Sequence, residues 1–226
     1  MNNLCIIPAR GGSKRIPGKN IKNFLDKPII AYSIETALRS KLFDEIMVST
    51  DDLEIAKTAK KYGASVPFIR SKKNSDDFAI LNDVYEEVIS SYNKLNVDFD
   101  HVCIILPTAP LITIENLHKS YEIMLDNNFD SVRPVVKFSY PIQRAYKMVN
   151  SGKLEFMQPK YYESRSQDLE PSYHDSGQFY WIYKGKNLLD SNKGAIVISE
   201  LEAQDIDNET DWKITELKYK LIQMND

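Results

Sequence analysis

Residues 4–22, LCIIPARGGSKRIPGKNIK, are the most informative stretch of this sequence. The apolar start at 4–7 predicts a short strand, and a loop rich in glycine and cations follows it. Ligands of an open α/β sheet bind where such strands end, and Gly11 and Gly12 allow backbone N–H groups to turn toward an anion. The cations of the stretch are Arg10, Lys14, Arg15, Lys19 and Lys22. We therefore expect a polyphosphate site, most simply for a nucleotide, with a solvated basic loop as the alternative.

The loop is neither of the two commonest phosphate-binding motifs. Five residues separate Gly12 from Gly18, and Asn20 follows Lys19, so the sequence lacks the spacing and the hydroxyl of a P-loop. No G-x-G-x-x-G pattern occurs either.

Composition indicates a single domain that spans residues 1–226. A hydrophobic content of 42% supports a real core, and a net charge of -3 argues against nucleic acid as the main partner. The two cysteines, Cys5 and Cys103, lie in apolar runs and are expected to be buried, reduced thiols. No signal peptide or long apolar run occurs, so we expect a soluble, cytoplasmic protein without a membrane partner.

Short apolar runs alternate with helical patterns along the chain. The periodicity predicts helices at 29–38, 52–62, 80–95 and 114–125, and a last helix capped by Asn208 with Ile214, Leu217 and Leu221 as its apolar stripe. Thr50 and Asp51 are the expected caps of the second helix. Strands are predicted at 4–7, 45–49, 66–69, 101–106, 131–136 and 180–183. Such alternation predicts an α/β fold with a doubly wound, mostly parallel, Rossmann-like sheet.

The alternation stops at residues 140–173, where Tyr, Pro, Gln, Arg and Ser dominate. Gly152 lies in a hairpin-like stretch, VNSGKLEF. The segment is too long for a simple loop, so it predicts a β-rich arm that projects from the sheet toward a second subunit.

Two carboxylates near the C-terminus, Asp205 and Asp207, flank Ile206. In an extended backbone both would point to one face, with Cα atoms roughly 6.6 Å apart. Mg²⁺ typically takes one or two protein carboxylates together with substrate phosphates, so the pair predicts a metal site complementary to the cationic loop. The alternative is an acidic turn before a helix, but Asn208 already provides that cap.

Three further segments carry polar groups suited to binding. The turn Leu106–Pro107–Thr108–Ala109–Pro110 would line a sugar or base pocket, or is a purely structural turn. Arg165 is suited to clamp a carboxylate, and Ser176 and Gln178 to bind sugar hydroxyl or acetamido groups. A tyrosine-rich core is the alternative for residues 173–181. The pairs Asp51–Asp52 and Asp76–Asp77 are weaker signals, explained by helix capping and by a nucleotide-contact loop near Arg70.

Taken together, these motifs resemble the cytidylyltransferases that make CMP-activated nonulosonic acids, relatives of CMP-sialic acid synthetase. The likeness covers nearly the whole chain. Its markers are 7–20, 48–52, 107–110, 165–169 and 205–207, followed by Asp211 and Trp212. Residues 173–181 most resemble the members that act on pseudaminic acid, and Leu106 stands where sialic acid enzymes carry a sugar-pocket Gln.

The resemblance implies CTP as co-substrate, Mg²⁺ as cofactor, a nine-carbon sugar acid as acceptor and a homodimer. The sugar's anomeric hydroxyl would attack the α-phosphorus and release pyrophosphate, with Lys19 and Asp207 acting in catalysis and Asp205 and Asp207 as metal ligands. The implied CTP contacts are Arg10, Gly11, Gly12, Ser13, Lys14, Lys19, Asn20, Arg70, Asp77 and Ala79. The implied sugar contacts are Arg165, Ser176, Gly177, Gln178 and Tyr180.

Other functions are compatible with the same motifs. The same reaction on legionaminic, N-acetylneuraminic or ketodeoxyoctonic acid is a close variant. A nucleotide-sugar-dependent glycosyltransferase would use the acidic pair as its metal motif, although such a motif usually follows an early central strand. A non-catalytic nucleotide-binding protein is the third class.

Overall fold

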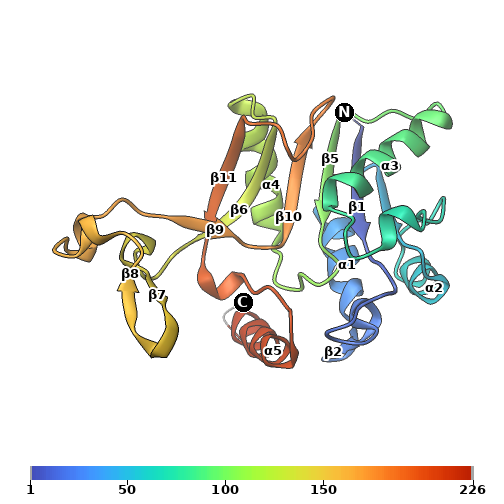
Figure 1. Ribbon diagram of the computed structural model, residues 1–226. Coiled ribbons are helices and arrows are strands. Elements are labelled where there is room, and N and C mark those ends of the chain that lie inside the picture. The colour runs from blue at the N-terminus through green and yellow to red at the C-terminus, as the bar shows by residue number, and fades with distance from the viewer. Residues whose placement is uncertain (1, 225–226) are drawn as a thin grey trace.

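The structure, a computed structural model, describes residues 2–224, and its strands and helices alternate as the sequence predicts (Figure 1). The helices are α1 (Ile29–Ser40), α2 (Leu53–Lys61), α3 (Leu81–Lys94), α4 (Ile114–Asp126) and α5 (Glu209–Gln223). The strands of the main sheet are β1 (Asn3–Pro8), β4 (Glu45–Ser49), β5 (His101–Ile105), β6 (Ser131–Lys137), β9 (Tyr173–Asp175), β10 (Phe179–Tyr183) and β11 (Lys193–Ile198). Two short hairpins pair β2 (Asn23–Phe24) with β3 (Lys27–Pro28) and β7 (Tyr146–Met148) with β8 (Leu154–Phe156). Short 3-10 helices occupy Lys19–Ile21, Lys73–Ser75, Ile142–Arg144, Asn150–Gly152, Pro159–Tyr161, Ser166–Asp168 and Glu200–Glu202.

The main sheet has the strand order β11-β6-β10-β5-β1-β4, with β9 paired to β6. Strands β5, β1 and β4 are parallel, as are β11 and β6, while β10 runs antiparallel between the two groups. The doubly wound, mostly parallel sheet predicted from the sequence is therefore confirmed, with β10 as an antiparallel connection.

Helices cover both faces of this sheet. On one face α1, α2 and α4 pack against Cys5, Ile7, Ile105 and Trp181, all fully buried. On the other face α3 packs against alternate residues of β1, β5 and β10, among them Leu4 and Ile104. Because the parallel strands are covered on both sides, they read as continuous apolar runs in the sequence. Both cysteines are buried and free, as expected.

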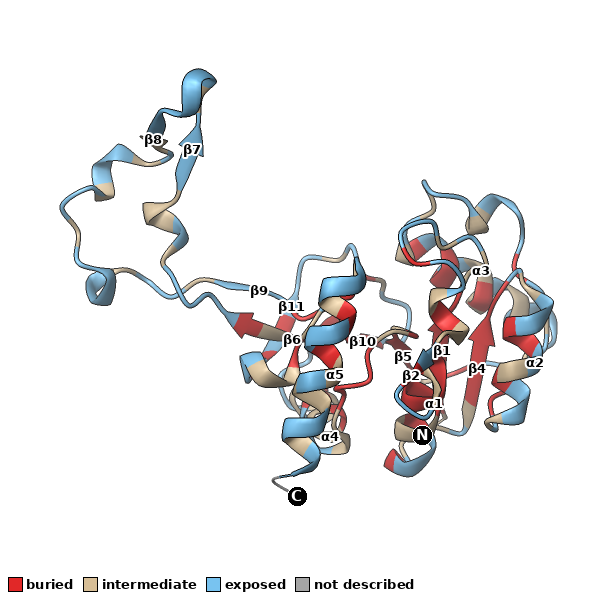
Figure 2. Cartoon of the chain, turned by 90° about the horizontal axis from the view of Figure 1, so that it is seen from below, coloured by how far each residue is buried: buried red, intermediate tan, exposed pale blue. Residues whose placement is uncertain are grey.

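The segment 140–173 leaves the body between β6 and β9 and extends away from the sheet (Figure 2). It contains the predicted hairpin, in which β7 and β8 pair with Tyr146 opposite Phe156. Many of its apolar side chains face solvent, including Tyr140 at 84% and Met148 at 74% exposure. We call this segment the arm.

Two local predictions were wrong, one strand was not predicted, and one predicted apolar stripe is exposed. Residues 66–69 form no strand, because the backbone there meets β4 only through an isolated bridge between Ser65 and Met47. Strand β11 was missed, although its residues alternate between buried and exposed. Helix α2 is capped by Asp52, whose carboxylate accepts from the N–H groups of Glu54 and Ile55. The apolar stripe of α5 is largely exposed, with Leu217 at 61%.

None of the helices within residues 2–224 has the length and apolar character needed to span a bilayer.

Candidate active site

A cleft of about 390 Å³ opens beside the C-terminal ends of β1 and β5. This volume suits a small-molecule ligand such as a nucleotide. The lining residues come from four parts of the chain that lie far apart in sequence. They are Pro8, Arg10, Ser13–Ile16, Lys19 and Asn20 from the first loop; Arg70, Asn74, Asp76, Asp77, Ala79–Leu81 and Val84 from the segment leading into α3; Leu106–Thr108 after β5; and Asp205 with Asp207 before α5. The basic loop and the acidic pair therefore share one cleft.

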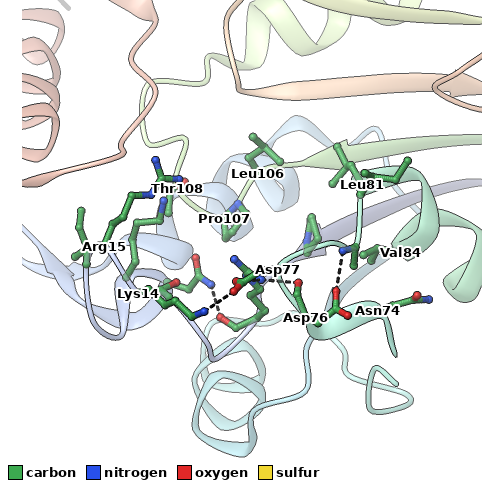
Figure 3. Close-up of a pocket in the computed structure, with 18 of the residues that line it drawn as sticks. Lys14, Arg15, Asn74, Asp76, Asp77, Leu81, Val84, Leu106, Pro107 and Thr108 are labelled. Carbon is green, nitrogen blue, oxygen red and sulfur yellow. Dashed lines mark hydrogen bonds and ion pairs between the residues drawn. The ribbon is translucent and has the colours of Figure 1, made fainter. Parts of the chain in front are cut away.

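The cations of the first loop are bound by acids of the chain itself. The Asp77 carboxylate pairs with Arg10 Nη1 at 3.0 Å and forms a short contact with Lys14 Nζ (Figure 3). Arg10 also donates to the backbone oxygen of Asp76 at 2.5 Å. These cations lower the pKa of Asp77, and Lys14 has the largest effect.

The two glycines of the loop do not line the cleft. The Gly11 N–H donates to Asp51 Oδ1 at 3.0 Å, and a Cβ atom at Gly11 would lie 2.7 Å from Asp52 Oδ2. At Gly12 a Cβ would meet nothing within 4 Å. Gly11 is therefore required for the close approach of the loop to the start of α2, and the expected contacts of both glycines with CTP stay predictions.

Lys19 and Asn20 connect the loop to the rest of the cleft. Lys19 Nζ donates to the backbone oxygen of Ile206 at 2.8 Å, which holds the ammonium group beside the acidic pair. Partial burial lowers the pKa of Lys19, and the Asp205 and Asp207 charges oppose this effect. Asn20 is buried and donates to the backbone oxygen of Arg10 at 2.9 Å, so it shapes the loop from behind.

Arg70 forms the inner wall of the cleft. It is only 6% exposed, and its guanidinium donates from Nε to Ser49 Oγ at 2.9 Å and from Nη2 to the Ser49 backbone oxygen. Burial lowers the pKa of Arg70 to about 10, so the group stays charged near neutral pH. The end of β4 thus fixes a buried cation at the cleft, and the expected contact of Arg70 with CTP stays a prediction.

The acidic pair has the alternation that the sequence predicts. Ile206 is fully buried in a cluster with Ile16, Phe24 and Trp212, while the residues on either side, Asp205 and Asp207, line the cleft. Asp211 holds this arrangement, because its carboxylate accepts from the Asp207 N–H at 2.9 Å. Asn208 caps α5 as predicted, accepting from the N–H groups of Thr210 and Asp211.

The electrostatics of the pair suit a divalent cation. Loss of hydration in the cleft and the charge of Asp207 raise the pKa of Asp205, although Asp205 remains open to solvent. Arg15 compensates part of this charge through an ion pair with Asp207 at 2.7 Å. No cluster of three or more His, Cys, Asp or Glu side chains suited to a metal occurs within residues 2–224. The pair would supply two oxygen ligands, and Mg²⁺ typically completes its coordination with water and substrate phosphates.

A second cavity of about 260 Å³ shares Asp205 with the cleft. Its lining includes Ser176, which is 3% exposed and whose Oγ has no hydrogen-bond partner. Gln178 is equally buried; its Nε2 donates to the Glu202 backbone oxygen, and its Oε1 has no partner. At Gly177, where φ is 66°, a Cβ would lie 3.7 Å from the Asp205 Cβ. The turn 176–178 therefore packs directly behind the acidic pair.

Of the five expected sugar contacts, Ser176 alone lines the second cavity; Gly177 and Gln178 adjoin it in sequence, and the other two lie elsewhere within residues 2–224. Tyr180 lines neither cavity; its hydroxyl donates to Asp175 Oδ1 at 3.1 Å, and the Arg133 guanidinium lies 4.9 Å from its ring. Arg165 lies on the arm, where it pairs with Asp168 through Nε at 2.6 Å and Nη2 at 3.1 Å. A single chain does not bring Arg165 to the cleft.

Sequence reasoning missed the structural roles of Asp51 and Asp211, and it did not assign Asn74 to the cleft wall, whereas Asp76 was expected in a nucleotide-contact loop and does line the cleft. Asp51 accepts from the Gly11 N–H, a contact between segments far apart in the sequence. Asp211 accepts from the Asp207 N–H, a contact that belongs to the cap of α5. The capping box of α5, Asn208 with Asp211 three residues later, was the one signal that would have identified Asp211.

This combination of a doubly wound sheet, a cationic loop and a late acidic pair is that of a nucleotide-binding enzyme. Residues 4–210 match the cytidylyltransferase family, and the chain belongs to that family of nucleotidyltransferases.

Individual relatives narrow the likeness further. The chain is 42% identical to the pseudaminic acid cytidylyltransferase of Campylobacter jejuni over 98% of its own length and 97% of that protein. It is 33% identical to the CMP-N,N'-diacetyllegionaminic acid synthase of Legionella pneumophila over 100% of its own length and 98% of that protein. Among solved structures, CMP:2-keto-3-deoxy-manno-octonic acid synthetase complexed with CTP has the same fold, with a TM-score of 0.69, 17% identity, and coverage of 99% of this chain and 100% of that chain.

Proposed function

We propose that this protein transfers CMP from CTP to the anomeric hydroxyl of pseudaminic acid and releases pyrophosphate. The observation that carries the proposal is that the cationic loop and the acidic pair, 187 residues apart in sequence, meet in one cleft through the bond from Lys19 to Ile206. Family membership supports the use of CTP, and the names of the C. jejuni relatives support the acceptor.

In this proposal the loop and the inner wall bind the nucleotide. Arg10, Ser13 and Lys14 contact the triphosphate. Arg70 and Ala79 border the cytidine, and Asp77 lines the cleft two residues before Ala79. Lys19 stands next to the acidic pair and stabilises negative charge that develops on the α-phosphate during transfer. The acceptor oxygen forms a bond to the α-phosphorus, the bond from the α-phosphorus to the bridging oxygen breaks so that pyrophosphate leaves, and the hydroxyl proton passes to solvent water. No side-chain nucleophile is needed.

Asp205 and Asp207 would hold Mg²⁺ together with phosphate oxygens of the nucleotide. Their side chains are hard oxygen donors on one side of the cleft, and their mutual repulsion is relieved by a divalent cation. When bound, the ion would lower the pKa of the acceptor hydroxyl and neutralise phosphate charge.

The second cavity is the place we propose for the sugar acid. It adjoins Asp205, and Ser176 Oγ is buried there without a partner, which suits a ligand hydroxyl or amide. The neighbouring Gly177, Gln178 and Tyr180 belong to the same proposal.

We further propose a homodimer in which the arm of one chain completes the sugar site of the other. The arm's exposed apolar side chains need a partner surface, and Arg165 lies on it, away from both cavities of its own chain. A cytoplasmic location, expected from the sequence and compatible with two free cysteines, completes the proposal.

The test is pyrophosphate release from CTP and Mg²⁺ with a panel of acceptors: pseudaminic, legionaminic, N-acetylneuraminic and ketodeoxyoctonic acid. We expect the highest kcat/KM with pseudaminic acid, and release with none of the acids would contradict the proposed function. A preference for legionaminic acid would instead assign this protein an acceptor like the one in the name of the L. pneumophila relative.

Asp207→Asn should reduce turnover by about 100-fold or more, because it removes half of the proposed metal ligation. Its melting temperature should change little, since the Asp207 ion pair with Arg15 is exposed. Asp98→Asn, which removes the same charge from a pair with Lys184, is the matched control and should keep full activity. An unchanged rate in Asp207→Asn would remove this residue from the metal site.

A further inference from the structure

One carboxylate, that of Asp77, bridges two cations of the first loop. It contacts Arg10 Nη1 at 3.0 Å and Lys14 Nζ at closer range, so one acid pairs with both groups, while the Asp76 backbone oxygen also accepts from Arg10 Nη1. Within the cleft, these are two of the side chains proposed to bind the triphosphate. The Asp77 carboxylate therefore pairs with the same cations that phosphate oxygens would contact.

The segment that carries Asp77 is anchored at both ends by side-chain hydrogen bonds. At one end, Glu87 accepts from the Ser71 N–H at 2.7 Å and from the Asn74 amide. At the other, the Ile80 N–H donates to Asp83 in the first turn of α3. Between these anchors Asp77 is 43% exposed, and its carboxylate is held by the loop cations.

The turn itself does not depend on Asp77. The Asp76 carboxylate accepts from the N–H groups of Phe78 and Ala79, each at 2.9 Å, so the local backbone is stabilised by the neighbouring residue. The Asp77 side chain can consequently leave the cations without the loss of this turn or of helix α3.

We infer that Asp77 is an intramolecular competitor of polyphosphate: it occupies Arg10 and Lys14 in the free enzyme and is displaced when the polyphosphate binds. This inference rests on the proposed function for the identity of the ligand. The competition weakens the binding of both CTP and pyrophosphate, and so it favours release of the pyrophosphate product. Asp77 is thereby an affinity-determining residue, not a catalytic one.

Direct competition predicts whether a substitution of Asp77 strengthens or weakens the binding of polyphosphate. Removal of a carboxylate that contacts the ligand or its metal would weaken binding, whereas removal of a competitor strengthens it. Two exposed ion pairs of ordinary strength correspond to about a fivefold change in the dissociation constant. Because these pairs are screened by salt, the change should shrink as ionic strength rises.

The experiment measures binding of inorganic tripolyphosphate, without metal or sugar, by calorimetry at 50 mM and 300 mM NaCl as chosen conditions. We expect Asp77→Asn to bind about fivefold more tightly than the wild type at the lower salt, with a smaller gain at the higher salt. Asp98→Asn is the control, because it makes the same change in net charge at the opposite end of β5 and should bind like the wild type.

The inference would be overturned by equal affinity in Asp77→Asn and wild type, by weaker binding in Asp77→Asn, or by an equal gain in Asp77→Asn and Asp98→Asn, which would reduce the effect to net charge. Absence of binding to any of the three proteins would overturn it as well. The probe carries no cytidine, so this result is independent of the acceptor panel, whose failure would instead contradict the proposed function.

Discussion

At the scale of single residues, Gly11 shows how tightly the cationic loop is fitted to its neighbour. A methyl group there would press on Asp52, whose other carboxylate oxygen caps α2. Gly12, the next residue in the same loop, has open space around it. The two glycines look alike in the sequence, but only one of them has a steric requirement for glycine.

We expect Gly11→Ala to lower the free energy of unfolding by about 1 kcal/mol, the usual cost of a lost helix cap, because Asp52 must move to make room. Gly12→Ala is the matched control and should stay within about 0.5 kcal/mol of the wild type. Urea unfolding measures both. Equal stability of the two variants would show that Asp52 can shift without leaving the α2 cap.

His101 provides a pH dependence of stability. It is 5% exposed, its Nδ1 lies 3.1 Å from the Tyr121 hydroxyl, and burial lowers its pKa below the usual 6.5. The unfolded chain therefore binds a proton near pH 6.5 that the folded chain does not bind. The contribution of neutral His101 to the free energy of unfolding should be fully present above pH 6.5 and should decrease as the pH falls below that value.

The measurement is the melting temperature between pH 7.5 and pH 5.5, where carboxylates contribute less. His101→Gln should show a shallower decline than the wild type over this range. Parallel curves for the two proteins would assign the pH dependence to other groups.

At the scale of elements, the start of α5 joins helix capping to the site. Asn208 caps the helix, and Asp211 in its first turn holds the backbone N–H of Asp207. The proposed metal ligand therefore depends on a helix end that is stabilised by local hydrogen bonds. A loosened cap should displace the carboxylate as well as destabilise the helix.

Asn208→Ala should cost about 1 kcal/mol of stability and also reduce kcat by about tenfold. Thr113→Ala removes the comparable cap of α4, where the Thr113 hydroxyl accepts from the Asn116 N–H at 3.1 Å. This control should lose similar stability and keep its turnover. If both variants lost activity in proportion to stability, the α5 cap would have no special link to the site.

The elements also show where sequence reasoning succeeds. The buried strands β1, β4 and β5 and helices α1, α3 and α4 were predictable because continuous apolar runs and a 3.6-residue period follow directly from burial. The strand expected at 66–69 did not form, since an apolar run cannot show whether a neighbouring strand is within reach. Leu217 belongs to the apolar stripe predicted for α5, yet it is largely exposed, because periodicity does not reveal what covers a helix face.

The same limit applies to the cleft. The cationic loop and the acidic pair were predictable as local motifs with complementary charge, and their convergence follows from the topology of the sheet. The pairing of Asp77 with Lys14 and of Arg15 with Asp207 depends on contacts between distant segments, which no local pattern encodes. For the same reason, the position of Arg165 outside both cavities was not predictable from its motif.

At the scale of the whole molecule, the arm is the feature that one chain leaves unexplained. It carries Arg165 and a set of exposed apolar side chains away from the body. In a symmetric dimer the same surface would be used by both chains, and each sugar site would combine residues of two subunits.

A complementation experiment tests this arrangement. Arg165→Ala and Asp207→Asn should each be nearly inactive, but a mixture that exchanges subunits should regain about one quarter of wild-type activity. This follows because about half of the dimers are then mixed and each mixed dimer holds one intact site. Activity assays after dilution and remixing, with sedimentation to confirm the dimer, measure the effect. No recovery despite subunit exchange would place Arg165 in its own chain's site or outside any site.

The bond from Lys19 to Ile206 spans 187 residues, and this separation has a consequence for synthesis on the ribosome. The N-terminal loop emerges with its positive charges long before the aspartates that face them have been translated. Sheet strands β1, β4 and β5 can pair early, whereas the acidic wall of the cleft is added only when α5 leaves the exit tunnel. Nascent chains thus hold the strands of the scaffold before the acidic wall of the cleft has been made.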